Sequence, residues 1–262
     1  MAADAAKRIV SLAPNLTEIA FAAGAGDRIV GTAEYSDYPQ AARQIPRVSD
    51  AFHFDYERIL SLRPDVVLSW EPGTPREVVE RLRALGLDVA TIRTEHLRDI
   101  AVATREIGKI AGTQSTANPV ADAFEQGIEK LRAEYGRRAV VSVFLQINDQ
   151  PLYTVNGRQV MSELVGLCGG KNVFASLNDL APQIGVEAVI AANPDAIIST
   201  GDANSPSFTQ WQRWPQMRAV RVGNVFVIPP DDVARSTPRL VEGAGTLCRT
   251  LQTARDRLAA SN

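Results

Sequence analysis

Few side chains of this sequence could form a metal site or a catalytic centre. There are two cysteines, Cys168 and Cys248, and two histidines, His53 and His96. A structural zinc site takes four Cys or His ligands at close spacing, and these four residues are scattered along the chain. Neither histidine adjoins a Gly-x-Ser-x-Gly motif, a phosphate-binding glycine loop or a dinucleotide fingerprint. We therefore expect no resident metal, no cofactor and no catalytic residues, and a protein that is not an enzyme.

The cysteines allow two interpretations. A bridge between Cys168 and Cys248 would close a long loop and stabilise the fold by roughly 4 kcal/mol in the chain-entropy model. Two buried free thiols, packed as small hydrophobic side chains, explain the residues equally well. Residue type and spacing do not decide between them.

Four segments rich in Pro, polar and aromatic residues each follow a predicted strand. In open α/β sheets, ligands bind beyond the carboxyl ends of the strands, so these segments favour a cleft. Tyr35 and Trp70 offer flat apolar faces, and Asp231 and Arg235 offer hydrogen bonds. In the alternative interpretation, Trp70 only covers the end of a sheet and Asp231 pairs with Arg235. The four segments are residues 35–39, 70–75, 147–151 and 229–238.

Two glutamates occupy matching positions in an internal repeat. Residues 57–69 read ERILSLRPDVVLS, and residues 187–199 read EAVIAANPDAIIS. Each copy predicts a short helix, a Pro-Asp turn and a strand. An acid in the first turn of a helix is favoured by the helix dipole, which is one explanation of Glu57 and Glu187. The other is a pair of acidic contacts, one in each half of the molecule, for a pseudo-symmetric partner.

The order of predicted elements indicates parallel sheets. Residues 8–14 form a buried strand that Pro14 ends, and the Asn15 and Glu18 pair predicts a capping box for the next helix. A second short strand at residues 27–33 completes a β-α-β unit, which favours a parallel sheet. The second half repeats this order, with a strand at residues 139–146 and a helix near residues 160–167.

We therefore predict an α/β protein of two similar lobes with mostly parallel central sheets. Apolar residues at helical spacing predict a helix over residues 119–137, long enough to cross one domain. The predicted divisions are an N-terminal lobe at 7–112, a connecting backbone helix at 113–138 and a C-terminal lobe at 139–262. A ligand cleft is expected between the lobes, and no second crossing is visible in the sequence.

Composition and charge exclude several classes of protein. The chain has 262 residues, of which 45% are hydrophobic, and suits two folded lobes. Its formal net charge of -2, without a basic stripe, argues against nucleic-acid binding. No segment has the length of a membrane-spanning apolar helix, and the first seven residues lack the apolar core of a secretory signal. The protein is either cytosolic or exported with its signal removed.

The order of several short motifs resembles the periplasmic binding proteins that have a single helical backbone. This family serves siderophore, haem and cobalamin importers, and the resemblance is closest to its cobalamin-binding members. It runs over nearly the whole chain. The motifs are the strand and Pro-Asn-x-Thr-Glu at 8–18, Tyr-Ser-Asp-Tyr-Pro at 35–39, Glu-Arg-Ile at 57–59, Cys-Gly-Gly at 168–170, Pro-Gln at 182–183 and Ser-Thr-Pro-Arg at 236–239.

The resemblance implies a periplasmic, monomeric receptor that delivers cobalamin or a related corrinoid to the permease dimer of an ABC importer. It implies that Glu57 and Glu187 dock onto the permease, and that Cys168 and Cys248 form a disulfide, as an oxidising periplasm allows. The ligand contacts that it implies are Tyr35, Trp70, Asp231, Asp232, Val233, Ala234 and Arg235.

This chain departs from the family pattern at the expected ligand surface. Small or aliphatic residues stand where close members have large aromatics, which should weaken or reshape the pocket. Phe52 or Phe54 could compensate. The tyrosine expected as iron ligand in haem-binding members is absent from residues 49–54, and His53 keeps haem as the alternative ligand, beside ferric siderophores. The departing residues are Ala51, Ile147 and Ala181.

Overall fold

The computed structural model describes residues 5–201 and 209–261, and the chain divides into two compact units. Unit 1 comprises Met1–Glu125 with Ser236–Pro238, and unit 2 comprises Gln126–Arg235 with Arg239–Asn262. The division falls inside helix α5 (Gln114–Tyr135), so both units contain part of it. The segment Ser236–Pro238 is a return of the chain to unit 1 that the sequence did not reveal. The domain boundaries predicted from the sequence stay a prediction.

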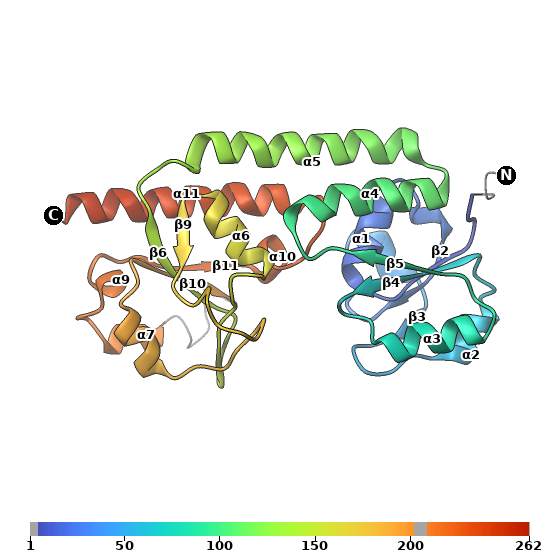
Figure 1. Ribbon diagram of the computed structural model, residues 1–262, viewed down its shortest axis with the longest axis horizontal. Coiled ribbons are helices and arrows are strands. Elements are labelled where there is room, and N and C mark those ends of the chain that lie inside the picture. Colours follow the sequence, from blue (N-terminus) through green and yellow to red (C-terminus); the bar gives the residue numbers. More distant parts are fainter. Residues whose placement is uncertain (1–4, 202–208, 262) are drawn as a thin grey trace. The chain divides into compact units, whose positions relative to one another are not determined.

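Unit 1 is built on a five-stranded sheet in the order β3-β2-β1-β4-β5, with every neighbouring pair parallel. Helices connect the strands (Figure 1). The strands are β1 (Ile9–Ser11), β2 (Ile29–Ala33), β3 (Arg47–Ser49), β4 (Val66–Glu71) and β5 (Val89–Arg93). The helices are α1 (Pro14–Ala22), η1 (Gly26–Arg28), η2 (Gln40–Gln44), α2 (Tyr56–Ser61), α3 (Arg76–Ala84) and α4 (Leu97–Ala111).

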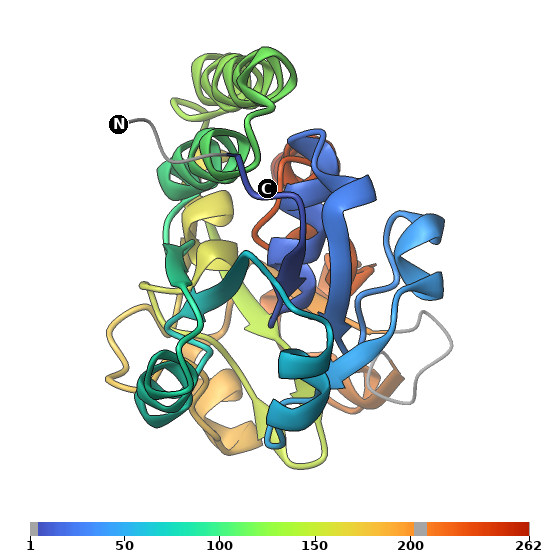
Figure 2. The same ribbon diagram turned by 90° about the vertical axis from the view of Figure 1, so that its right-hand side faces the viewer.

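Alternation along the strands gives this sheet two apolar faces. Ile9 belongs to a core shared with α1 and α4, whereas the next residue, Val10, belongs to a core shared with α2 and α3. Successive side chains of a strand point to opposite faces, so both faces of the sheet are buried. Figure 2 shows α1 and α4 on one side of these strands and α2 and α3 on the other.

Unit 2 is a second α/β lobe, with a four-stranded sheet in the order β11-β10-β6-β9 and parallel pairing throughout. Two mostly parallel α/β lobes therefore confirm the predicted fold class. The strands are β6 (Val141–Gln146), β9 (Gly170–Asn172), β10 (Ala196–Thr200) and β11 (Val225–Ile228), beside the small hairpin β7 (Asn148–Asp149) and β8 (Leu152–Tyr153). The helices are α6 (Val160–Leu167), α7 (Val186–Ala192), η3 (Gln210–Arg213), α9 (Arg218–Arg221), α10 (Pro230–Val233) and α11 (Leu240–Ala260).

The core of unit 2 has an aromatic centre and a covalent link. The Phe144 ring meets the rings of Phe174 and Trp211 edge-on, with centroids 5.7 and 5.6 Å apart. Cys168, at the end of α6, is disulfide-bonded to Cys248 in α11, and both are fully buried. Of the two interpretations of the cysteines, the disulfide is therefore correct. Across the described residues, no helix combines the length and apolar character needed to span a membrane.

The long helix α5 begins before residue 119, where its apolar pattern starts. Its first residue is Gln114, and Pro119 lies inside it rather than at its start. The carbonyl oxygen of Thr113 accepts bonds from Thr116 and Ala117, so the first turn forms before the proline is reached. Within unit 1, α5 is held to α4, because the Arg105 guanidinium donates to Asp122 at 2.6 Å and to Glu125 at 2.7 Å.

The predicted capping box at the start of α1 is wrong. The helix begins at Pro14 after Ala13, and no side chain caps it. Both predicted capping residues have partners far away in the sequence: the Asn15 amide donates to the Thr94 hydroxyl at 3.1 Å, and the Glu18 carboxylate accepts a 2.7 Å bond from Thr237. Tertiary contacts have replaced the local motif.

The internal repeat has a structural role at its two aspartates. Asp65 precedes β4, and its carboxylate accepts from the backbone N–H groups of Lys7 and Arg8, at 2.7 and 2.9 Å, where β1 begins. Asp195 precedes β10 and accepts from the backbone N–H of Ser142, at 2.9 Å, near the start of β6. In each unit the aspartate fastens the amino end of its strand to the parallel neighbour, β1 or β6.

The first prediction concerns Asp65, whose pKa is lowered below its ordinary value of 3.8, chiefly by the backbone N–H of Lys7 and then by that of Arg8. The ionised carboxylate therefore stabilises the fold fully at pH values above its ordinary pKa of 3.8, and this stabilisation is lost as the pH falls through the lowered pKa of the folded state. We expect Asp65→Asn to lower the urea midpoint at pH 7 and to match the wild type at the acid end of a pH series. Asp88→Asn, at an exposed aspartate, should change the midpoint little. An Asp65 effect that persists undiminished in acid would contradict this.

Candidate functional site

The predicted ligand residues of unit 1 gather at one edge of its sheet. Because the strands are parallel, their carboxyl ends share an edge. Tyr35 comes two residues after β2, residues 50–53 follow β3, and Trp70 lies near the end of β4. The loops after β2 and β3 are joined directly, since the backbone N–H of Glu34 donates to the carbonyl oxygen of Ser49 at 2.7 Å.

The Tyr35 ring projects from a turn that is fixed from beneath. Its side chain is 76% exposed, and its backbone has φ of +62°, a left-handed conformation that costs a non-glycine residue about 1 kcal/mol or more. The next residue, Ser36, is fully buried, and its hydroxyl lies 3.1 Å from that of Thr17. Arg47 donates to the Ser36 carbonyl oxygen at 2.9 Å. The turn is therefore held in place while an apolar face remains exposed to solvent.

Trp70 lies on strand β4 itself, not in the loop that the sequence indicated. Its indole N–H donates to the Thr94 hydroxyl at 2.8 Å, and a Cβ at Gly73 would overlap its ring. Thr94 is buried and also accepts from Asn15. These contacts agree with the alternative that Trp70 covers the end of the sheet, and they fix the orientation of its half-exposed ring.

The predicted residues of unit 2 lie at the corresponding edge of the other sheet. Helix α10 follows β11, and within this segment Arg235 forms an ion pair with Asp231 at 3.1 Å. The pairing in the alternative interpretation is thus present. Val233 is buried, so it supports the helix, whereas Ala234 is exposed and Asp232 is half-buried. A side chain at Gly243 would overlap the carbonyl oxygen of Asp232, so only glycine lets α11 pack this closely on α10.

The positions where large aromatics were expected have distinct surroundings. Ala51 and Ala181 are exposed, and Ile147 is half-buried with its backbone N–H bonded to the carbonyl oxygen of Tyr153. Of the two phenylalanines that could compensate, Phe54 packs against the core formed with α2 and α3. Phe52 is 87% exposed. Of this pair, only Phe52 therefore presents a free aromatic face.

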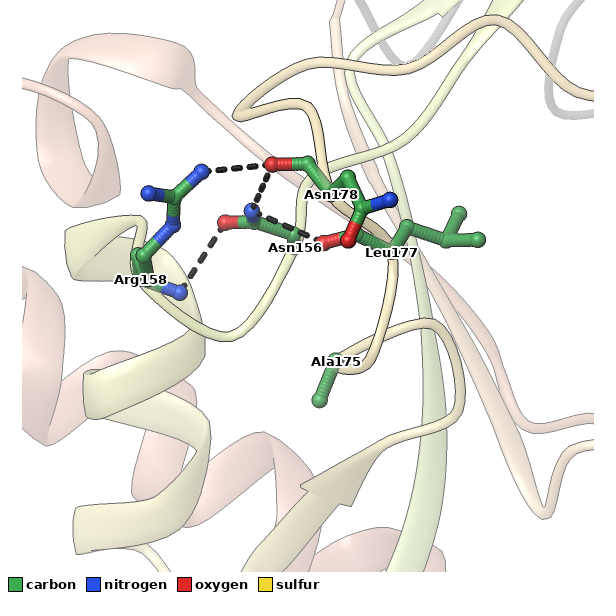
Figure 3. A pocket seen from close by; sticks show the side chains of 5 residues that line it. All are labelled: Asn156, Arg158, Ala175, Leu177 and Asn178. Atoms are coloured by element: carbon green, nitrogen blue, oxygen red, sulfur yellow. Dashed lines mark hydrogen bonds between the residues drawn. The ribbon is translucent and has the colours of Figure 1, made fainter.

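Sequence reasoning missed a pocket of about 430 Å³ in unit 2 (Figure 3). Its lining includes Asn156 and Arg158 from one loop and Leu177 and Asn178 from another. The Asn156 amide nitrogen donates to the carbonyl oxygens of Leu177 and Asn178, and its oxygen accepts from the backbone N–H of Arg158. The amide is thus used to join the two loops. The Asn-Gly pair at 156–157 was the sequence signal for this turn.

A family model described as periplasmic binding protein matches residues 9–232. The chain belongs to this family. The vitamin B12-binding protein of Yersinia pestis (strain Pestoides F) is 34% identical over 249 residues, covering 95% of this chain and 88% of that protein. The crystal structure of the periplasmic vitamin B12 binding protein BtuF of Vibrio cholerae matches with a TM-score of 0.89 and 33% identity, covering 95% of this chain and 98% of that one. The periplasmic heme binding protein HutB of Vibrio cholerae shares the fold, with a TM-score of 0.80 and 19% identity. The match covers 93% of this chain and 98% of that one.

In this periplasmic binding protein, Glu57 and Glu187 are equivalent. Each lies in the first turn of its helix, α2 or α7, and each is exposed. At α2 the capping is done by Asp55, whose carboxylate accepts from the backbone N–H of Arg58 at 2.9 Å. Glu57 is therefore not needed as the cap. Its role in docking stays a prediction, as does that of Glu187.

The second prediction tests how the Trp70 ring is held in this periplasmic binding protein. Thr94→Val keeps the shape of the side chain but leaves the indole N–H of Trp70 and the amide of Asn15 without their acceptor. We expect a loss of about 1–3 kcal/mol in the free energy of unfolding, measured by urea titration. Thr113→Val is the matched control, because the buried Thr113 hydroxyl has no hydrogen-bond partner in the part of the chain that the structure describes. Equal stabilities of the two variants would refute the role of Thr94.

Proposed function

We propose that this chain captures cobalamin or a related corrinoid in the periplasm and delivers it to the permease dimer of an ABC importer. Similarity over nearly the whole chain to a protein named vitamin B12-binding protein carries the proposal. The haem-binding structures are too distant in sequence to indicate a ligand and support the fold alone. Haem and ferric siderophores remain the alternative ligands. The family is one of binding proteins, and the proposed role involves no chemical change in the ligand.

The side chains suit a corrinoid, which has two broad apolar faces and a fringe of amide groups. In the proposal, the rings of Tyr35 and Trp70 cover part of a face, since aromatic rings bury large areas at low entropic cost. The carboxylate of Asp231 accepts hydrogen bonds from the amide fringe, and the Arg235 guanidinium donates to it. The segment from Asp231 to Arg235 includes the backbone groups of Asp232, Val233 and Ala234. That both sets of residues face one cleft stays a prediction.

The third prediction is a titration of the protein with cyanocobalamin, cobinamide, haemin and ferric siderophores by calorimetry. We expect cyanocobalamin to bind with a micromolar or lower Kd. Tyr35→Ala should weaken it about 30-fold, since truncating an aromatic anchor at a binding site costs about 2 kcal/mol. Tyr35→Phe keeps the ring and should bind nearly as well as the wild type. Absence of binding by every corrinoid would overturn the proposed function.

The fourth prediction concerns delivery. Glu57→Ala combined with Glu187→Ala removes both acidic contacts proposed for the permease, so we expect weaker association with the reconstituted importer and unchanged corrinoid affinity. Glu77→Ala is the control, because Glu77 is an exposed acid in the first turn of α3. Association is measured by surface capture of the importer in lipid nanodiscs. Unchanged association of the double variant, or a loss of its corrinoid affinity, would contradict the assignment.

A further inference from the structure

The loop after β3 holds a histidine in a closed turn at the candidate ligand edge. The backbone N–H of Asp50 donates to the carbonyl oxygen of His53 at 2.9 Å, and a β-bridge joins the flanking residues Ser49 and Phe54. The Asp50 carboxylate accepts from the backbone N–H groups of Phe52 and His53, each at 2.7 Å. These bonds together define the turn, and the imidazole extends from a fixed backbone.

The same carboxylate also orients the imidazole. The second oxygen of Asp50 lies 3.3 Å from Nδ1 of His53. The Asp50 carboxylate already accepts two backbone N–H groups through its first oxygen, and an ionised carboxylate can only accept. Nδ1 therefore carries the proton in this hydrogen bond, and in the neutral imidazole the lone pair lies on Nε2. Histidines that bind metals commonly have this carboxylate behind them.

The environment of His53 favours one metal-ligand bond rather than a metal-ion site. The imidazole is 86% exposed, and Nε2 has no hydrogen-bond partner among the described residues. In the same part of the chain, no group of three or more His, Cys, Asp or Glu side chains is placed to hold an ion. One imidazole alone cannot retain a free cation. It can bind a metal whose other coordination positions are already filled by a macrocycle.

Neighbouring side chains suit the face of such a macrocycle. Phe52, directly before His53, is 87% exposed, and Tyr35 is exposed on the loop that the Glu34 to Ser49 hydrogen bond joins to β3. Two exposed aromatic side chains and one free nitrogen lone pair therefore lie on adjacent loops of unit 1. Apolar rings beside a metal ligand are what the face and centre of a metal macrocycle require.

We propose that Nε2 of His53 binds the central metal of the captured macrocycle at an axial position, which selects corrinoids whose cobalt carries an exchangeable axial ligand. This inference rests on the proposed function and adds the ligand class. In aquocobalamin, the cobalt–water bond breaks, the water leaves, and the imidazole lone pair forms the cobalt–nitrogen bond. No electron or proton is transferred. Cyanide is held far more tightly by cobalt, so cyanocobalamin should bind through the other contacts alone.

The test compares aquocobalamin with cyanocobalamin on the intact protein, following the visible absorption spectrum and the Kd. We expect aquocobalamin to show the spectral shift of nitrogen ligation and to bind at least about tenfold more tightly, a difference of about 1.4 kcal/mol. His53→Ala should abolish both the shift and the preference while keeping the cyanocobalamin affinity. His96→Gln, which changes the other histidine, should keep both. Asp50→Asn should diminish the shift, because it removes the charge that orients the imidazole.

The outcomes separate the two proposals. Binding of both corrinoids with no shift, or with a shift that His53→Ala retains, would overturn axial ligation and leave the proposed function standing. Binding of neither corrinoid would overturn the proposed function. If haemin then gave a shift that depended on His53, ligation by His53 would stand and the corrinoid assignment would fall. Nitrogen hyperfine structure in the electron paramagnetic resonance spectrum of bound cob(II)inamide, which lacks an axial base of its own, provides a second readout if it is sensitive to ¹⁵N-histidine labelling.

Discussion

Parallel strand pairing is the constraint on which the arrangement of the site residues depends. It places all carboxyl ends of a sheet at one edge and all amino ends at the other. In each unit an aspartate of the repeat secures the amino end, Asp65 for β1 and Asp195 for β6. The loops at the opposite edge are then free to vary in sequence without loss of the sheet. The two aspartates of the repeat therefore serve folding, its two glutamates are the residues proposed for docking, and the side chains proposed to bind the ligand lie outside it.

Local pattern in the sequence predicted the elements and their order. Buried strands, the succession of helices and the two lobes were evident from apolar runs and from the repeated Pro-Asp turn. Contacts between segments that are far apart in the sequence could not be predicted from these patterns. Asn15 and Glu18 form a capping box by spacing alone, but in the fold their side chains reach Thr94 and Thr237, which pattern cannot identify. The return of residues 236–238 to unit 1 is of the same kind, because it depends on where the chain meets α1.

The candidate site was predictable by residue type but not by geometry. The aromatic and charged residues after the strands were evident, yet the support that fixes them was not. Trp70 is fixed by Thr94 and by a glycine that its ring covers, and the fixed turn beneath Tyr35 depends on Ser36 and Arg47. The Trp70 ring and the turn beneath Tyr35 are therefore already fixed when the protein folds, before any ligand binds. Binding then costs little further entropy, which favours affinity for a bulky, rigid ligand.

The departure at Ala51 gains a physical explanation from the turn that contains it, whereas those at Ile147 and Ala181, in unit 2, have no structural explanation. A large aromatic side chain buries roughly 150–250 Å², so its replacement by alanine gives up apolar contact with a flat ligand face. Phe52 places one exposed ring beside Ala51, on a loop whose backbone is fixed by Asp50. A metal–nitrogen bond from His53 would add a directional interaction that apolar area cannot supply. A surface with both interactions would distinguish ligands by their exchangeable axial group as well as by the shape of the macrocycle. The metal–nitrogen bond depends on the axial position, whereas the apolar contacts do not.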